Sequence, residues 1–449
     1  MRIPDPEYRC DLAKSSANNS PLALTRCAAT MALLSCLLSS MSGCSGASLP
    51  NTVRPAEQDS SSTQTLSWLS RAALQSFLDF NVAMGWRSGF VVSVARDGRV
   101  VHSLSSGYAD IEAKRQFALD TRVRIASMTK PITAVAAMIL IEDGRLGIDD
   151  PVEKYIPAAS LARVATSHNK NSAGEISSAP LDRTLTVRHL LTFRSGIGWN
   201  EDSDLGSIWA THGLSGDNKG NLEQRVKHTF SNAPLFEQPG TAWRYGGSAD
   251  VLGRVIEVAS GQNFSEFLQQ WLFDPLGMKA TTFAKEGGDL SDLATMYTQD
   301  EEGRLVPTSA ISHSIEWHSG GGGLISTAND YMRFALMLSN EGTYQGIQIL
   351  KPETLLELRT AHVKEGVLQD MDIDGMGWGL GLGVVLDEDK TPMTDRNGDF
   401  WWAGFYDTKF FVSPSSGLAV VVLAQNQPSE YSGLPVATHA VQSFVYFGL

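Results

Sequence analysis

One stretch near residue 130 constrains this chain more than any other. Ser127 and Lys130 stand three residues apart in it. Apolar residues then recur at helical intervals: Ile132, Val135, Ala136, Ile139 and Leu140. This spacing predicts a buried α-helix that ends near Gly144. Ser127 then lies at or near the helix N-terminus, and Lys130 lies one turn further on the same face. Pro131 is compatible because it falls in the first turn, where few helix hydrogen bonds are lost.

A serine at such a helix start has the surroundings that an acyl-transfer nucleophile needs. The first backbone N–H groups of a helix lack partners inside the helix, and the helix dipole is positive there. Both features stabilise negative charge that develops beside the serine. The spacing alone is weak, because Ser127 could simply cap a core helix. A second copy, Ser167 to Lys170, has no apolar helix behind it, and we interpret it as chance.

Strand patterns occur at both ends of the chain and helical patterns between them. The expected strands are Phe90–Ala95, Arg99–Leu104, Gly379–Leu386, Phe400–Gly404, Thr408–Val412 and Leu418–Ala424. The expected helices are Leu66–Met84, Leu185–Leu191, Val251–Ala259, Phe264–Phe273, Asp330–Leu338 and Val436–Phe447, with a turn at Asp274–Gly277 and an exposed loop at Ser167–Pro180. The sequence therefore predicts an α+β fold, an α/β sandwich whose antiparallel sheet is built from both chain ends and flanked by helices.

Length and charge limit the organisation and the partners. The 449 residues suffice for two domains or for one large fold with an insertion. We expect residues 66–150 and 311–449 to form an α/β subdomain and residues 151–310 a mostly helical one. The net charge is −13 and no long run of Lys and Arg occurs. Nucleic acid is therefore not an expected partner.

The N-terminal segment has the pattern of an export signal. All four cysteines, Cys10, Cys27, Cys36 and Cys44, lie in it, so the body after Cys44 can form no disulfide or thiolate metal site. The apolar part, Ala28–Leu38, is too short to span a bilayer and suits a signal peptide.

Met41–Ser45 resembles the lipobox of bacterial lipoproteins. The resemblance implies that residues 1–43 are removed, that Cys44 is acylated, and that the protein is held on the periplasmic side of a bacterial membrane, with the outer membrane favoured. Residues 44–65 then form a flexible tether. A start codon upstream of the true one would explain why the segment before Arg26 is long and carries Asp5, Glu7 and Asp11. An ordinary signal peptide or a short disordered tail is the alternative.

Two further groups could carry chemistry. Tyr245 lies in Trp243–Gly253, a glycine-containing loop that precedes a helix, and Trp401–Phe405 enters the C-terminal strands. A tyrosine in such a place could shuttle protons, and a glycine in a strand allows close approach of backbone or ligand. Ordinary packing is the competing explanation for both groups.

Together, these segments resemble the serine β-lactamase and penicillin-binding-protein superfamily, most closely the class C-like family VIII carboxylesterases. The resemblance covers most of the chain after Leu66 and implies a β-lactamase/transpeptidase-like fold with no metal and no cofactor. By position, it makes Ser127 the nucleophile, Lys130 its activating partner and Tyr245 the tyrosine of the second motif. It assigns the oxyanion hole to the backbone N–H groups of Ser127 and Phe405.

The sequence departs from the superfamily at two binding positions. Trp402, Ala403 and Gly404 stand where penicillin-processing members carry Lys-Thr-Gly, and Gly247 stands where they carry Asn. The expected substrate-binding residues therefore offer no cation and no amide, which favours an uncharged acyl substrate.

From these residues we expect a serine hydrolase that cleaves carboxylic esters through an acyl-enzyme, with a small ester or amide as its partner and membrane contact only through Cys44. A β-lactamase, a D-amino-acid peptidase or an amide hydrolase of the same fold is the first alternative. A catalytically idle envelope-binding protein is the second. The chain has no G-x-S-x-G, no phosphate-binding loop motif and no H-E-x-x-H.

Overall fold

The computed structural model describes residues 66–199, 202–214, 220–284, 289–309, 316–368, 373–391, 394–428 and 437–448. The predicted signal segment, the lipid-anchor residue Cys44 and the tether lie outside the described residues. They remain predictions.

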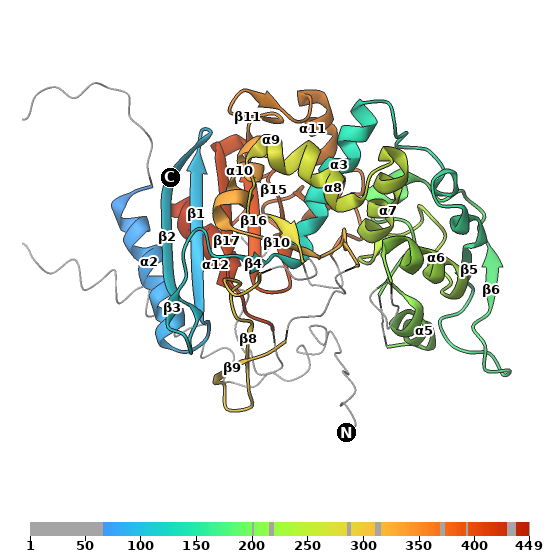
Figure 1. Ribbon diagram of the computed structural model, residues 1–449, viewed down its shortest axis with the longest axis horizontal. Coiled ribbons are helices and arrows are strands. Elements are labelled where there is room, and N and C mark those ends of the chain that lie inside the picture. Colours follow the sequence, from blue (N-terminus) through green and yellow to red (C-terminus); the bar gives the residue numbers. More distant parts are fainter. Residues whose placement is uncertain are drawn as a thin grey trace, which may run out of the picture. The chain divides into compact units, whose positions relative to one another are not determined.

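The described residues are organised around one eight-stranded antiparallel sheet with the strand order β13-β14-β15-β16-β17-β1-β2-β3 (Figure 1). Its strands are β1 (Gly89–Arg96), β2 (Arg99–Asp110), β3 (Arg115–Gln116), β13 (Met376–Trp378), β14 (Gly383–Val385), β15 (Phe400–Gly404), β16 (Thr408–Ser413) and β17 (Leu418–Leu423). The N-terminal strand β1 pairs with the C-terminal strand β17, with Val91 opposite Leu423. This confirms the predicted α+β fold, in which both chain ends build one antiparallel sheet.

Short strands form the smaller sheets around this core. They are β4 (Val123–Arg124), β10 (Leu324–Ser326) and β7 (Thr282–Phe283) in one sheet, and the pairs β5 (Arg163–Ala165) with β6 (Ser178–Pro180), β8 (Tyr297–Gln299) with β9 (Leu305–Pro307), and β11 (Thr343–Tyr344) with β12 (Ile347–Gln348). The first of these sheets positions the site, because Arg124 lies opposite Ile325 in it.

The α-helices of the described residues are α2 (Trp68–Ala83), α3 (Thr129–Glu142), α4 (Val187–Leu191), α5 (Asp204–His212), α6 (Leu222–Asn232), α7 (Ser248–Ser260), α8 (Phe264–Leu268), α9 (Asp274–Leu276), α10 (Ala328–Ser339), α11 (Pro352–Arg359) and α12 (Ala437–Phe447). The main sheet is covered by α10 on one face and by α2 and α12 on the other, whereas α5, α6 and α7 lie away from it (Figure 1). Shorter turns are η2 (Ala126–Met128), η3 (Val152–Lys154), η4 (Pro157–Leu161), the π-helical η5 (Gln269–Phe273) and η7 (Pro414–Ser416).

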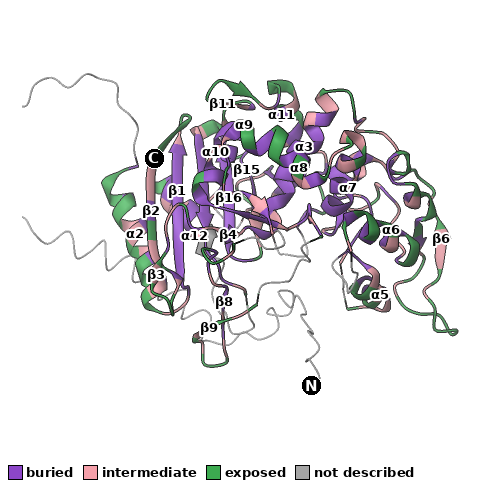
Figure 2. Ribbon diagram, in the orientation of Figure 1, coloured by how far each residue is buried: buried purple, intermediate pink, exposed green. Residues whose placement is uncertain are grey.

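Side-chain alternation along β16 explains the two-sided packing. Successive strand residues point to opposite faces of a sheet. Phe410 contacts Tyr331 of α10, with ring centroids 5.2 Å apart, whereas Phe411 stacks on Tyr446 of α12 at 5.9 Å. The centre of the sheet and α3 are therefore buried, while α2 at the sheet edge carries exposed residues (Figure 2).

Three local predictions need correction. The expected strand Gly379–Leu386 is a hairpin, because the chain turns between β13 and β14 and Gly381 takes a φ of +82° that glycine tolerates. The expected turn at Asp274–Gly277 is helical as far as Leu276, since Pro275 falls in the first turn of α9. The expected exposed loop Ser167–Pro180 ends in β6, which pairs with β5.

The strand expected at Arg99–Leu104 continues to Asp110, and the helix expected at Phe264–Phe273 is α-helical only as far as Leu268 and π-helical beyond it. The other expected strands and helices coincide with observed elements to within three residues at each end. The division at residues 151 and 310 remains a prediction.

Candidate active site

Ser127 lies in a tight turn immediately before α3. It belongs to η2, and Thr129 is the first residue of α3. Ala126, just before it, has a φ of +45°, a left-handed conformation that costs a residue with a Cβ about 1–2 kcal/mol. The turn is held by the neighbouring sheet, since the Ile125 N–H donates to the Leu324 carbonyl at 3.1 Å. The half-buried Ser127 side chain therefore has a fixed position in a strained turn.

Lys130 is buried directly behind the serine. Lys130 is the second residue of α3 and is only 2% exposed. The Nζ atom donates to Ser127 Oγ at 3.0 Å and to the Gly321 carbonyl at 2.7 Å. The predicted nucleophile and its predicted activating amine are therefore within proton-transfer distance of each other.

A buried carboxylate fixes the glycine segment that contacts Lys130. Asp250, in the first turn of α7, accepts a hydrogen bond from Ser319 Oγ at 2.6 Å and a long one from the Gly321 N–H at 3.4 Å. Burial raises the pKa of Asp250, against the opposing effects of the Ser319 hydrogen bond and the charge of Lys130. Thr133 of α3 also donates to the Gly320 carbonyl at 2.8 Å. The segment is therefore clamped from two helices.

Tyr245 covers the Lys130 amine. The Nζ atom lies 4.7 Å from the centre of the tyrosine ring. Three aromatic rings surround Tyr245, with centroid distances of 5.7 Å to Phe193, 6.2 Å to Trp243 and 5.4 Å to Trp402. The structure thus brings Ser127, Lys130 and Tyr245 together, as the sequence predicts.

Trp402 lies beside Tyr245 and is mostly covered by neighbouring rings. It is 4% exposed and packs at right angles on Trp378, with ring centroids 4.6 Å apart. That its side chain binds substrate stays a prediction. Its contact with Tyr245 also helps to hold the tyrosine ring in place.

Gly404 allows β15 to approach the Ser127 turn. A Cβ on Gly404 would lie 2.3 Å from the Ile125 carbonyl oxygen and 2.2 Å from Thr408 Oγ1. Thr408 Oγ1 itself donates to the Ile125 carbonyl at 3.2 Å. Ala403 and Gly404 are half-buried at the end of the strand, and Phe405, which follows, is 46% exposed. The predicted oxyanion residues Ser127 and Phe405 thus come from two segments in direct contact.

Gly247 does not replace the missing asparagine. It is the residue before the first turn of α7 and is buried, and a Cβ there would meet Leu214 Cδ1 at 2.6 Å. Leu214 therefore occupies the space where a side chain from position 247 would begin. The site keeps its aromatic and apolar character on this side.

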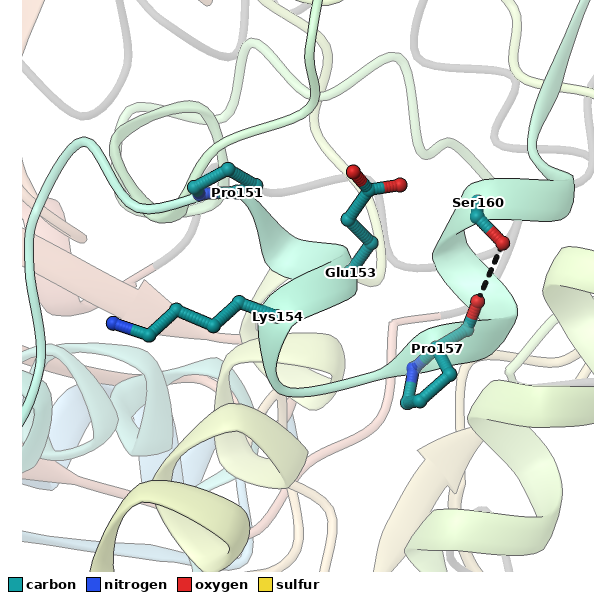
Figure 3. A pocket seen from close by; sticks show the side chains of 5 residues that line it. All are labelled: Pro151, Glu153, Lys154, Pro157 and Ser160. Atoms are coloured by element: carbon teal, nitrogen blue, oxygen red, sulfur yellow. Dashed lines mark hydrogen bonds between the residues drawn. The ribbon is translucent and has the colours of Figure 1, made fainter.

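Other surface features carry no comparable chemistry. A hollow of about 420 Å³ is lined by Pro151, Glu153, Lys154, Pro157 and Ser160 and contains none of the candidate site residues (Figure 3). Within the described ranges, no cluster of three or more His, Cys, Asp or Glu side chains could hold a metal ion. The helices in the described part of the chain include none with the length and apolar character needed to cross a membrane.

The sequence analysis missed Asp250, Ser319 and Gly321. One signal was present, because Asp250 is an acidic residue next to the apolar run Val251–Leu252 of a predicted core helix. A carboxylate in that setting is rarely buried without a specific partner. Its partner at Gly321 is 71 residues away in sequence and could not be inferred from spacing.

Comparison with known proteins places this geometry in context. A family model described as Beta-lactamase matches residues 72–441. Esterase EstB of Burkholderia gladioli is 31% identical over 405 residues, covering 84% of this chain and 96% of its own. An uncharacterized protein of Mycobacterium tuberculosis is 32% identical over 356 residues, covering 77% and 87%. The solved structure of EstCE1, described as a hydrolase with promiscuous acyltransferase activity, is 26% identical with a TM-score of 0.71, covering 84% of this chain and 98% of its own.

Proposed function

The chain belongs to the beta-lactamase family and is a serine hydrolase of that fold, and we propose that it cleaves carboxylic esters through an acyl-enzyme on Ser127. The observation that carries this proposal is the 3.0 Å contact between Lys130 Nζ and Ser127 Oγ. A serine hydroxyl needs an adjacent base to become a nucleophile, and this contact supplies one.

Two features favour an ester over a β-lactam in this proposal. Trp402 and Gly247 stand where penicillin-processing relatives offer a cation and an amide, and Leu214 fills the space beside Gly247. A buried aromatic surround gives little to hold a charged substrate carboxylate. Similarity to proteins named as an esterase and a hydrolase points the same way, and a family VIII-type carboxylesterase is the finer assignment we propose.

In the proposed acylation step, three side chains take part. The amine of Lys130 takes the proton of Ser127 Oγ, which attacks the ester carbonyl carbon. The backbone N–H groups of Ser127 and Phe405 are proposed to hold the oxyanion, each such donor being worth about 3 kcal/mol of barrier. Tyr245 relays the proton from Lys130 to the leaving alkoxide, and the alcohol departs.

Deacylation uses the same groups in reverse order. Water enters, and Tyr245 accepts one of its protons as the oxygen attacks the acyl carbon. The proton returns through Lys130 to Ser127 Oγ as the acid leaves. Gly321 and Asp250 keep the Lys130 amine in place through both steps, because the Gly321 carbonyl accepts one of its hydrogen bonds.

We also propose that the enzyme works outside the cytoplasm. The signal-like segment and the lipobox-like Met41–Ser45 support export and acylation at Cys44. The protein would then be tethered to a bacterial membrane by residues 44–65 and act on small esters on the periplasmic side.

The test compares p-nitrophenyl butyrate with a chromogenic cephalosporin on the wild type and three variants. Ser127→Ala should lower ester turnover by about 10⁵–10⁶-fold, since it removes the nucleophile. Tyr245→Phe should lower it by about 10²–10⁴-fold, since it removes the proton relay. The matched control is Ser167→Ala, in the other S-x-x-K copy, which should leave turnover unchanged.

The outcomes separate the candidate functions. Ester cleavage that needs Ser127, with slow cephalosporin turnover, supports the esterase. Fast cephalosporin turnover would make the protein a β-lactamase instead. Retention of ester activity in Ser127→Ala would refute the nucleophile, and failure of the wild type to react with a fluorophosphonate would favour the idle binding protein.

A further inference from the structure

Helix α2 is apolar on its inner side and on part of its outer side. Leu74 and Leu78 are buried against the rest of the molecule, while Leu69, Phe80 and Met84 are exposed. Figures 1 and 2 show α2 at the edge of the molecule with green, exposed stretches. A helix with apolar residues on opposite sides is normally covered on both. The exposed apolar residues of α2 therefore indicate that another surface packs against the outer side of this helix.

The exposed apolar residues form one continuous surface. Leu69, Ala73, Phe80 and Met84 follow one another after four, seven and four residues, so they share a side of the helix. Phe77, beside this stripe, packs on Phe444 of α12 with ring centroids 5.2 Å apart. Phe447 lies one turn after Phe444 and is 80% exposed.

The start of α2 is tied to the end of α12, because the Ser67 N–H donates to the Gly448 carbonyl at 3.0 Å. This contact holds Phe447 beside the start of α2. We name Leu69, Phe80, Met84 and Phe447 the α2 surface. Trp68 is 64% exposed but lies on another side of the helix, about 100° around the axis from Leu69.

The α2 surface carries no charged residue. Asp79, the nearest acidic residue of the helix, is turned toward β2, because it accepts hydrogen bonds from Gln75 Nε2 at 2.9 Å and from Ser106 Oγ at 2.6 Å. Four large apolar side chains that include two phenylalanines are compatible with a surface that enters the boundary between lipid headgroups and acyl chains.

We propose that the α2 surface rests on a lipid bilayer. The position of α2 in the chain supports a lipid occupant over another protein. The described chain begins at Leu66, and residues 45–65 are all that separate it from the predicted acylation site at Cys44. If a chain of that length behaved as a random coil, it would span about 25 Å on average, similar to the roughly 24 Å length of a 16-residue helix.

Such a tether would hold α2 within reach of the membrane that anchors Cys44. Anchoring would keep the α2 surface at a high local concentration beside the bilayer. A small apolar surface can then bind lipid, although the same surface on an unanchored protein would bind only marginally. This inference rests on the proposed anchor but not on the proposed ester hydrolysis, so either can fail without the other.

The experiment uses a single fluorescent label, because the chain has no cysteine after Cys44. Ser76→Cys lies on the exposed part of α2 and leaves the α2 surface intact, and Ser207→Cys on α5 is the matched control. The full chain is expressed in a bacterial host that acylates lipoproteins and purified from its membranes. It is then labelled with an environment-sensitive dye and placed in vesicles of phosphatidylethanolamine and phosphatidylglycerol that carry a nitroxide lipid.

The nitroxide lipid should quench the dye at position 76 several-fold more than the dye at position 207. Leu69→Ser with Phe80→Ser, in the Ser76→Cys chain, should remove this difference while p-nitrophenyl butyrate hydrolysis stays as in the parent, which shows that the chain is folded. Equal quenching at the two positions would overturn the proposal. Shielding of position 76 that grows with protein concentration in the absence of vesicles would assign the surface to a second copy instead. Absence of the protein from the membrane fraction would overturn the proposal together with the anchor.

Discussion

Replacing Gly404 with alanine should damage catalysis far more than it damages folding. The added Cβ would lie 2.3 Å from the Ile125 carbonyl oxygen, where a separation of at least 3.0 Å is needed. One of the two segments must therefore move by about 0.7 Å. The Ile125 carbonyl has little freedom to move, because Met128 N–H at 3.1 Å and Thr408 Oγ1 at 3.2 Å both donate to it.

The end of β15, which leads directly to Phe405, must therefore be the segment that moves. An oxyanion donor works only within about 2.7–3.1 Å of the oxygen, so a 0.7 Å shift takes the Phe405 N–H out of range. We expect kcat to fall by about 10²–10³-fold, the loss of one donor. Overpacking of this kind should lower the free energy of unfolding by only about 1–3 kcal/mol.

The assay measures kcat and KM for p-nitrophenyl butyrate together with the thermal midpoint. The control is Gly383→Ala in the adjacent strand β14, where the new Cβ would meet the flexible end of Met376 at 3.0 Å. That variant should keep kcat close to the wild-type value. Adding Thr408→Ala to Gly404→Ala should not restore kcat, since the contact with Ile125 remains. A Gly404→Ala enzyme with kcat within twofold of wild type would refute the assignment of the oxyanion hole.

Three further predictions concern groups around the site and on the opposite face of the sheet. Asp250→Asn should lower kcat/KM at least about tenfold, because a neutral amide oxygen accepts more weakly than a carboxylate from Ser319 Oγ and the Gly321 N–H. The segment whose Gly321 carbonyl holds Lys130 is then less firmly fixed. Asp330→Asn, at another buried carboxylate, should lower stability without changing kcat, and equal kcat losses would contradict the positioning role. Ala126→Gly should be neutral or stabilising in urea unfolding, because glycine relieves the φ of +45°, and a loss above about 1 kcal/mol would contradict the strain. Burial raises the pKa of Asp399 to about 6. Between pH 3.8 and about 6, the native state therefore keeps a proton that the unfolded state releases. The free energy of unfolding should fall by up to about 3 kcal/mol as the pH rises through this range. Asp399→Asn should flatten this dependence, and an unchanged pH profile would show that Asp399 is ionised in the fold.

The residues of the proposed reaction were predicted from sequence because each stands in a segment that resembles a motif of the superfamily. The apolar stripe behind Ser127 defined a buried helix, and the structure places Lys130 at 3.0 Å from the serine hydroxyl as that helix requires. Strand patterns at both chain ends implied one sheet, and β1 indeed pairs with β17. Local periodicity determines both results.

Contacts between segments that are far apart in sequence could not be predicted from local patterns. The packing of Trp402 on Trp378, 24 positions earlier, could not be inferred from the sequence, which placed Trp402 only at an expected substrate-binding position. The apolar run at Gly379–Leu386 has the composition of a strand and becomes a hairpin because glycines permit the turn. In each case the outcome depends on which remote segment packs against the residue, and composition does not encode that.

Glycines account for much of what the sequence analysis could not provide, since they determine how closely the catalytic segments approach. A Cβ on Gly404 would meet the Ile125 carbonyl at 2.3 Å, one on Gly320 would meet the Ala249 carbonyl at 2.4 Å, and one on Gly246 would meet the Ile197 carbonyl at 2.2 Å. Each contact joins a different pair of segments around Ser127, Lys130 and Tyr245. Because all three neighbours are backbone atoms, they cannot rotate away as a side chain could. The chemistry of the site thus resides in three reactive side chains, and their mutual distances depend on glycines that take no part in the reaction. A substitution at one of these glycines should therefore impair turnover while every proposed reacting group remains present.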